Sequence, residues 1–194
     1  ILSKLEGQVI IRHPEYNMDD RLLFHTIDWQ NGTITIQGKT YPLTTKDFPT
    51  VNPKDPYQLS PEEHRIMSQI TSEFLESERL HKHIRFFYSH GSLYRGYNNN
   101  LLFHGGVPLN EDGSFKEIFF YGKPYKGKAF MDMADFMARQ AYNKRDTDSL
   151  DYMWYMWCGQ DSPVSGRIVK TFERSYIKDE STWKEPQNAD YLLN

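Results

Sequence analysis

Hydrophobic and polar residues alternate along residues 22–43, which is the pattern of half-buried β-strands. Two turn signals, Asn31-Gly32 and Gln37-Gly38, divide this stretch into three runs. The pattern therefore predicts a small antiparallel meander in which neighbouring strands are joined by tight turns. The predicted strands are 22–28, 33–36 and 40–43.

A proline-rich connector and a helix are predicted next. Three prolines within residues 47–56 disfavour both helix geometry and strand hydrogen bonding. A helix start follows at Ser60, which is succeeded by Pro61 at the first helical position and by the carboxylate of Glu63 three residues after the cap. Apolar residues then recur at helical spacing and predict one long amphipathic helix to about Lys82. This apolar face consists of Ile66, Ile70, Phe74, Leu75 and Leu80.

The second half of the chain contains short apolar runs between glycine-rich and asparagine-rich turns, which favour further strands. Helical spacing returns in two later stretches, the second of which is an aromatic block. From Gln160 onward the pattern is mostly typical of loops. The predicted strands are 86–88, 101–103, 118–121 and 168–172, and the predicted helices are 130–141 and 150–157.

Composition indicates a folded chain of one domain, or of one domain with a small appendage. Of its 194 residues only 38% are hydrophobic, but 15% are aromatic and can bury large areas. The net charge of −3 gives no attraction to polyanions, so we expect no nucleic-acid partner. No apolar run is long enough to cross a membrane, and no export signal is visible. The one cysteine, Cys158, fits a buried thiol in a reducing cytoplasm.

His104 is the first candidate for chemistry, because it ends the apolar run 101–103 and precedes Gly105 and Gly106. A histidine at the carboxyl end of a strand points toward the crevice where open α/β sheets bind ligands, and neutral imidazole binds transition metals. The two glycines lack a Cβ, so a phosphate or a metal ion could approach their backbone closely. A structural histidine beside a turn is the alternative that these residues alone leave open.

Other polar and aromatic residues have simpler alternatives. Arg167 and Arg174 could bind substrate phosphates, because the guanidinium group matches phosphate geometry, or they could be solvated surface charges. Asp132 and Asp135 are three residues apart on a predicted helix, where carboxylates usually form a solvated face. The aromatic block at 150–157 could stack on a sugar, but its helical spacing favours a place in the core.

A family resemblance adds to this reading. Residues 89–115, SHGSLYRGYNNNLLFHGGVPLNEDGSF, resemble the corresponding part of bacterial class III fructose-1,6-bisphosphatases. Within them, HisGlyGly followed by Pro108 is similar to the third metal-binding block of phosphoprotein phosphatases and calcineurin. Further segments resemble the same family, so the likeness extends over nearly the whole chain. They are DDRLL at 19–23, NPKDPY at 52–57, YKGKA at 125–129, WYMWCG at 154–159 and TFER at 171–174.

The resemblance implies cytoplasmic hydrolysis of fructose 1,6-bisphosphate to fructose 6-phosphate in gluconeogenesis. It implies two metal ions, expected to be Mn²⁺, that share a bridging hydroxide. Only His104 matches a ligand position, because the Asp-x-His, GlyAspxxAsp, GlyAsnHis and later Gly-His blocks of the superfamily are absent from the sequence. One histidine cannot hold two ions. We therefore expect a piece of a longer enzyme, inactive alone and without identifiable catalytic residues.

The fold that the resemblance implies is α+β to α/β, a partial metallophosphoesterase-type β-sandwich flanked by helices. Residues 1–84 would form an insertion of meander, proline-rich connector and amphipathic helix, and residues 85–194 the C-terminal part of the metallophosphoesterase domain. Two alternatives stay open: a phosphoprotein phosphatase-like enzyme, which shares HisGlyGly, and a noncatalytic module that binds carbohydrate or protein through its aromatic residues. The expected partner is fructose 1,6-bisphosphate, and association of identical chains also stays open.

Overall fold

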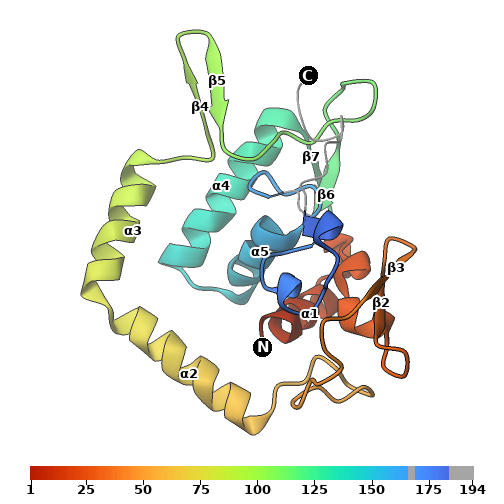
Figure 1. Cartoon of the computed structure of the whole chain (residues 1–194). Helices are drawn as coiled ribbons and strands as arrows, with labels where there is room; N and C mark the ends of the chain where they lie inside the picture. The colour runs from red at the N-terminus through yellow and green to blue at the C-terminus, as the bar shows by residue number, and fades with distance from the viewer. Residues whose placement is uncertain (166–168, 184–194) are drawn as a thin grey trace.

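The computed structural model describes residues 1–165 and 169–183 as a mixed chain of helices and short strands (Figure 1). These residues form five α-helices and seven strands, joined by loops and short 3₁₀ turns. The helices are α1 (Leu2–Arg12), α2 (Pro61–Glu76), α3 (Glu78–His90), α4 (Gly127–Asn143) and α5 (Thr147–Cys158). The strands are β1 (Ile27–Asp28), β2 (Thr33–Ile36), β3 (Lys39–Pro42), β4 (Tyr94–Tyr97), β5 (Asn100–Phe103), β6 (Ile118–Phe120) and β7 (Lys123–Tyr125).

All strand pairs among the described residues are antiparallel, in the sheets β1-β2-β3, β4-β5 and β6-β7. The predicted mixed α and β content is therefore confirmed. None of the described helices is long and apolar enough to cross a bilayer.

The predicted meander is confirmed in its second and third strands but is wrong in its first. Residues 23–26 form a 3₁₀ turn, and only Ile27 and Asp28 pair with β2. Leu23 and Phe24 are both buried, and consecutive buried residues cannot alternate between the two faces of a strand. The first turn spans four residues rather than two, because Asp28 pairs with Thr33. The second turn forms at Gln37-Gly38, where both residues have positive φ.

The start of α2 confirms the predicted capping box: Ser60 accepts a hydrogen bond from the backbone of Glu63, whose side chain accepts one from Ser60. The predicted end near Lys82 is wrong. The helix stops at Glu76, and Ser77 caps the separate helix α3 by accepting a hydrogen bond from Leu80 N at 3.3 Å. Helix α3 also replaces the strand predicted at 86–88, since those residues continue its helical path.

Later elements agree better with the sequence. Strand β5 covers the predicted 101–103 and pairs with β4 across Asn98 and Asn99, both at positive φ. Strand β6 and helices α4 and α5 match their predicted positions. The sequence predicted strand β6 but not its partner β7, because β7 contains Pro124 and a proline disfavours a strand. The strand predicted at 168–172 is wrong for residues 169–172, which form a bend and a turn, and Ile168 lies outside the described residues.

Two hydrophobic cores hold these elements together, and each uses residues from both sides of position 84. The first core joins α1 to β6, α4 and α5, and the second joins the meander to residues 169–177. The largest fully buried apolar side chains include Tyr152, Phe120, Phe130 and Ile10 in the first core and Leu23, Ile34 and Ile177 in the second. Consequently the two ends of the chain fold against each other.

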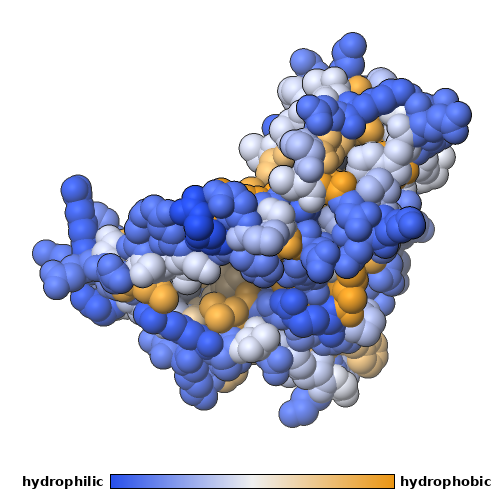
Figure 2. All heavy atoms as spheres, turned by 90° about the horizontal axis from the view of Figure 1, so that it is seen from below, coloured by the Kyte–Doolittle hydropathy of each residue, from blue (hydrophilic) through white to orange (hydrophobic). Residues whose placement is uncertain are grey.

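Helices α2 and α3 form an arm (residues 61–90) at the edge of the molecule (Figure 1). Between Leu59 and Val107 no hydrophobic residue is fully buried. Helices α3 and α4 are joined by a hydrogen bond between His81 Nδ1 and the hydroxyl of Tyr142 and by one that the hydroxyl of Tyr88 donates to the carbonyl of Ala138. Seen from below, the molecule has a hollow in which hydrophobic residues are exposed (Figure 2). The arm therefore leaves apolar surface open.

Candidate functional site

His104 follows the last residue of β5, at the base of the hairpin that projects at the top of Figure 1. Its side chain is exposed and makes no hydrogen bond or ion pair with another described residue. The hairpin is not part of an open parallel sheet, so the expected sheet crevice beside His104 is not formed by the described residues. An exposed, unengaged imidazole can still donate one nitrogen to a metal ion.

Gly105 and Gly106 lie against the loop at residues 163–164. A Cβ on Gly105 would lie 2.8 Å from the carbonyl carbon of Val164 and closer still to the carbonyl oxygen of Pro163. Gly106 N donates a long hydrogen bond of 3.4 Å to the same Pro163 oxygen. The group that approaches Gly105 closely is therefore backbone of this same chain, at Pro163 and Val164. This packing explains why residue 105 has no side chain, and the sequence pattern did not reveal it.

Ser162 shapes the loop that meets these glycines. Its buried hydroxyl donates to the carbonyl oxygen of Met156, near the end of α5, and accepts hydrogen bonds from Val164 N at 3.0 Å and Ser165 N at 3.3 Å. The turn after His104 is thus supported, through Pro163 and Val164, by the end of α5. No sequence signal identified Ser162, because its partners are mostly backbone groups.

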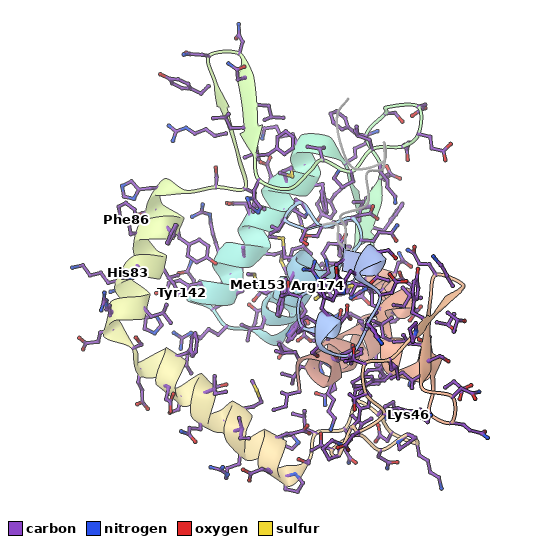
Figure 3. All side chains as sticks on the ribbon, in the orientation of Figure 1. Lys46, His83, Phe86, Tyr142, Met153 and Arg174 are labelled. Carbon is purple, nitrogen blue, oxygen red and sulfur yellow. The ribbon has the colours of Figure 1, made fainter. Side chains whose placement is uncertain are left out.

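Of the two candidate phosphate-binding arginines, the structure describes Arg174 alone. Arg174 donates from Nη2 to the carbonyl oxygen of Trp183 at 2.9 Å, and its guanidinium lies 5.4 Å from the centroid of the Trp183 ring. Its Nε is buried without a hydrogen-bond partner among the described atoms. Arg167 lies outside the described residues. Figure 3 labels Arg174, which lies beside the C-terminal 3₁₀ turns rather than near the β4-β5 hairpin.

The remaining polar candidates occupy structural positions. Asp132 pairs with Lys128 at 2.6 Å, and Asp135 pairs with Arg139 at 2.6 Å, each along the surface of α4. Both aspartates therefore lie on a solvated face of the helix, as the sequence indicated. In the aromatic block, Tyr152 and Tyr155 are buried in the first core, so a sugar-stacking platform built on them is excluded.

No group of three or more histidine, cysteine, aspartate or glutamate side chains in the described ranges is arranged to hold a metal ion. A dinuclear site needs several such ligands. The described residues therefore do not fit a complete metal centre, and His104 can contribute a single ligand to one.

A buried group of charged side chains lies between the two cores, and sequence reasoning missed it. Nη2 of Arg21 donates to both carboxylate oxygens of Glu173, at 2.8 and 2.7 Å, and lies 3.6 Å from Glu6 Oε1. All three side chains are at most 3% exposed. Glu173 also accepts a hydrogen bond from Lys170 N at 2.7 Å. The group links α1, the 3₁₀ turn Asp19–Arg21 and the C-terminal 3₁₀ turn Glu173–Ser175.

Burial shifts the pKa values in this group. Desolvation, followed by repulsion from Glu173, raises the pKa of Glu6 to about 8 against the attraction of Arg21. Desolvation lowers the pKa of Lys170 to about 8. Burial also raises the pKa of the Cys158 thiol well above its usual range, which makes this cysteine a poor nucleophile and confirms its interpretation as a buried thiol.

The raised pKa of Glu6 predicts a pH dependence of stability. The folded chain keeps a proton on Glu6 that the unfolded chain releases, so the free energy of unfolding should fall as pH rises from 4.5 to 8. Glu6→Gln removes this contribution, and the variant should gain stability relative to the wild type across that window. Urea unfolding at several pH values checks this. Parallel curves for the two proteins would contradict it.

Together these features define a mixed α/β chain that presents a HisGlyGly turn at the base of an exposed hairpin, and residues 1–165 and 169–183 form no complete metal centre. The model of the Firmicute fructose-1,6-bisphosphatase family matches residues 1–194, and the chain belongs to this family. The predicted resemblance is thereby confirmed over the whole chain.

Curated relatives agree with the family match. A fructose-1,6-bisphosphatase class 3 of Clostridium beijerinckii is 46% identical over 198 residues, which cover 100% of this chain and 30% of that protein. Those of Clostridium tetani and Parabacteroides distasonis are 48% and 44% identical, cover 98% and 100% of this chain, and are each covered over 30% of their length. The chain therefore spans about 30% of the relatives it matches. No solved structure matches it.

Proposed function

We propose that this chain is part of a cytoplasmic, metal-dependent phosphatase that hydrolyses fructose 1,6-bisphosphate to fructose 6-phosphate and phosphate. The observation that supports this most strongly is the family match over residues 1–194, together with relatives named fructose-1,6-bisphosphatase class 3 at 43–48% identity. A carbohydrate-binding module is less favoured, because Tyr152 and Tyr155 of its aromatic platform are in the core.

His104 is the metal ligand that this chain contributes in the proposed enzyme. Support comes from its side chain, which is exposed and makes no hydrogen bond or ion pair with the described residues, and from the turn at Gly105 and Gly106 that follows it. The metal is proposed to be Mn²⁺, with its other ligands outside the described residues. Arg167 and Arg174 stay proposals for binding the substrate phosphates, and Arg174 would then have to share or leave the carbonyl oxygen of Trp183.

The proposed fold of the whole enzyme is a metallophosphoesterase-type β-sandwich, with residues 85–194 in that domain and residues 1–84 inserted and packed against them. Strand β5 supports this proposal. Leu101 is 50% exposed and Leu102 is 56% exposed, and neighbouring residues in a strand point to opposite faces. A strand with apolar residues on both faces is typical of a sheet covered on both sides. Such coverage would also enclose His104.

Removal of metal from the intact protein tests the proposed activity. Dialysis against a chelator should abolish phosphate release from fructose 1,6-bisphosphate, and Mn²⁺ should restore it with fructose 6-phosphate as the product. A phosphoserine peptide serves as the comparison substrate. Faster release from the peptide would favour the phosphoprotein phosphatase alternative, and activity unaffected by the chelator would overturn the proposed metal dependence.

A further inference from the structure

The arm exposes more of its surface than any helix that packs into the cores. Residues 68–76, the last two turns of α2, are exposed on all sides. They include Ile70, Phe74 and Leu75, which are 42%, 59% and 45% exposed. An amphipathic helix whose apolar side remains in water lacks the partner that usually stabilises it. We therefore expect the apolar side of α2 to bind another surface.

Helix α3 has an apolar outer side as well. Phe86 and Phe87 are 61% and 71% exposed. In Figure 3, His83 and Phe86 point away from Tyr142, which lies between α3 and α4. The side of α3 that faces α4 is therefore already occupied, and the side with Phe86 is free to contact another molecule.

The two helices of the arm have opposite charges. Near its end α2 exposes Glu73 and Glu76, whose carboxylates accept hydrogen bonds from Gln69 and Ser72 of the same helix and form no ion pair within the part of the chain that the structure describes. Helix α3 exposes three basic residues that make no ion pair with a described residue. They are Arg79, Lys82 and Arg85. Each helix thus carries unpaired charges that the other could neutralise, but within one arm the two helices are consecutive and cannot lie side by side.

We propose that two copies of this chain associate through their arms, with α2 of each copy packed antiparallel against α3 of the other. The helices contain 16 and 13 residues and are therefore about 24 and 20 Å long, so they match in length. A two-fold axis repeats the same acidic-to-basic contact twice. Ile70 and Phe74 of one copy would then cover Phe86 and Phe87 of its partner.

A second copy fits this surface because the charges are self-complementary. A partner of another kind would have to supply a basic strip for α2 and an acidic strip for α3, whereas a second copy has both. The apolar residues between the charges supply the buried centre that stable interfaces need. The inference uses only the arm and does not depend on the proposed hydrolase activity.

Charge reversal in the full-length protein tests the proposal. One variant combines Glu73→Lys with Glu76→Lys, and the other combines Arg79→Glu with Lys82→Glu. In analytical ultracentrifugation the wild type should be dimeric or a multiple of the dimer, and each variant alone should lose this association, because like charges then meet at both contacts. An equimolar mixture of the two variants should associate again, since each α2 then meets an α3 of opposite charge.

A matched pair of reversals away from the arm, Lys54→Glu and Glu111→Lys, should leave the association unchanged. Phosphate release by all variants separates this test from the proposed activity, because loss of the dimer and loss of hydrolysis are measured independently. A wild type that stays monomeric, variants that still associate alone, or a mixture that fails to reassociate would each overturn the arm-to-arm contact.

Discussion

Replacement of Arg21 by methionine is expected to lower the free energy of unfolding by about 3–5 kcal/mol, which is the usual cost of removing one partner from a buried ion pair. The substitution leaves the carboxylate of Glu173 buried without its two hydrogen bonds from Arg21, which measure 2.8 and 2.7 Å. Arg21 also lowers the pKa of Glu6, whose Oε1 lies 3.6 Å from the guanidinium, so the substitution should raise that pKa further and keep Glu6 protonated. Urea unfolding followed by circular dichroism measures the loss.

Two further variants show whether burial is the cause. Arg65→Met breaks the exposed pair with Glu62, where both side chains are 64% exposed, and should leave the free energy of unfolding nearly unchanged because solvent screens this pair. Combining Arg21→Met with Glu173→Leu and Glu6→Gln should recover much of the lost stability, because the carboxylate of Glu173 is then no longer left buried without its hydrogen bonds. If Arg21→Met costs no more than Arg65→Met, the group does not stabilise the fold.

The His104→Ala variant of the intact protein is expected to release phosphate at least about 100-fold more slowly at limiting Mn²⁺. Mutation of residues that only hydrogen-bond to a metal ligand already lowers metal affinity or activity by about 10–100-fold. The proposed reason is loss of one metal ligand. Because His104 is exposed and makes no hydrogen bond with a described residue, its removal should leave the melting temperature of the metal-free protein unchanged. Metal content after gel filtration gives a second readout and should fall with the activity.

His25→Ala is the matched control, because His25 is also exposed and its ring lies nearly perpendicular to the ring of Tyr57, at a centroid distance of 5.0 Å. This variant should keep both metal and activity. Equal activity of the wild type and His104→Ala, or an equal loss in His25→Ala, would remove His104 from the proposed site.

The sequence predicted the elements whose signals are local. The capping box at Ser60, the turn at Gln37-Gly38 and the strand at 33–36 each depend on a few neighbouring residues, and all three are confirmed. The break at Ser77 was missed because the apolar spacing continues across it. The serine that caps α3 is followed by Glu78, so the signal for a new helix was present but was hidden by the periodic pattern.

Residues that meet across the chain could not be predicted in the same way. Gly105 is confined by Pro163 and Val164, and Arg21 binds Glu173, but nothing in the sequence near either residue indicates its partner. A charged residue is normally assigned to the surface, so Glu6 and Arg21 would be placed there by composition alone. At the candidate site, sequence could place His104 at the end of a strand, whereas its surroundings depend on segments far away along the chain.

The sharing of both cores by the two ends of the chain has a consequence for synthesis on the ribosome. Helix α1 contributes Val9 and Ile10 to the first core, whose other members include Tyr155 and Cys158. At about 5–20 residues per second, roughly 7–30 s would pass between the synthesis of these two groups. During that interval the apolar side of α1 has no native partner. We therefore expect the nascent chain to present an apolar surface that chaperones can bind until α5 has been made.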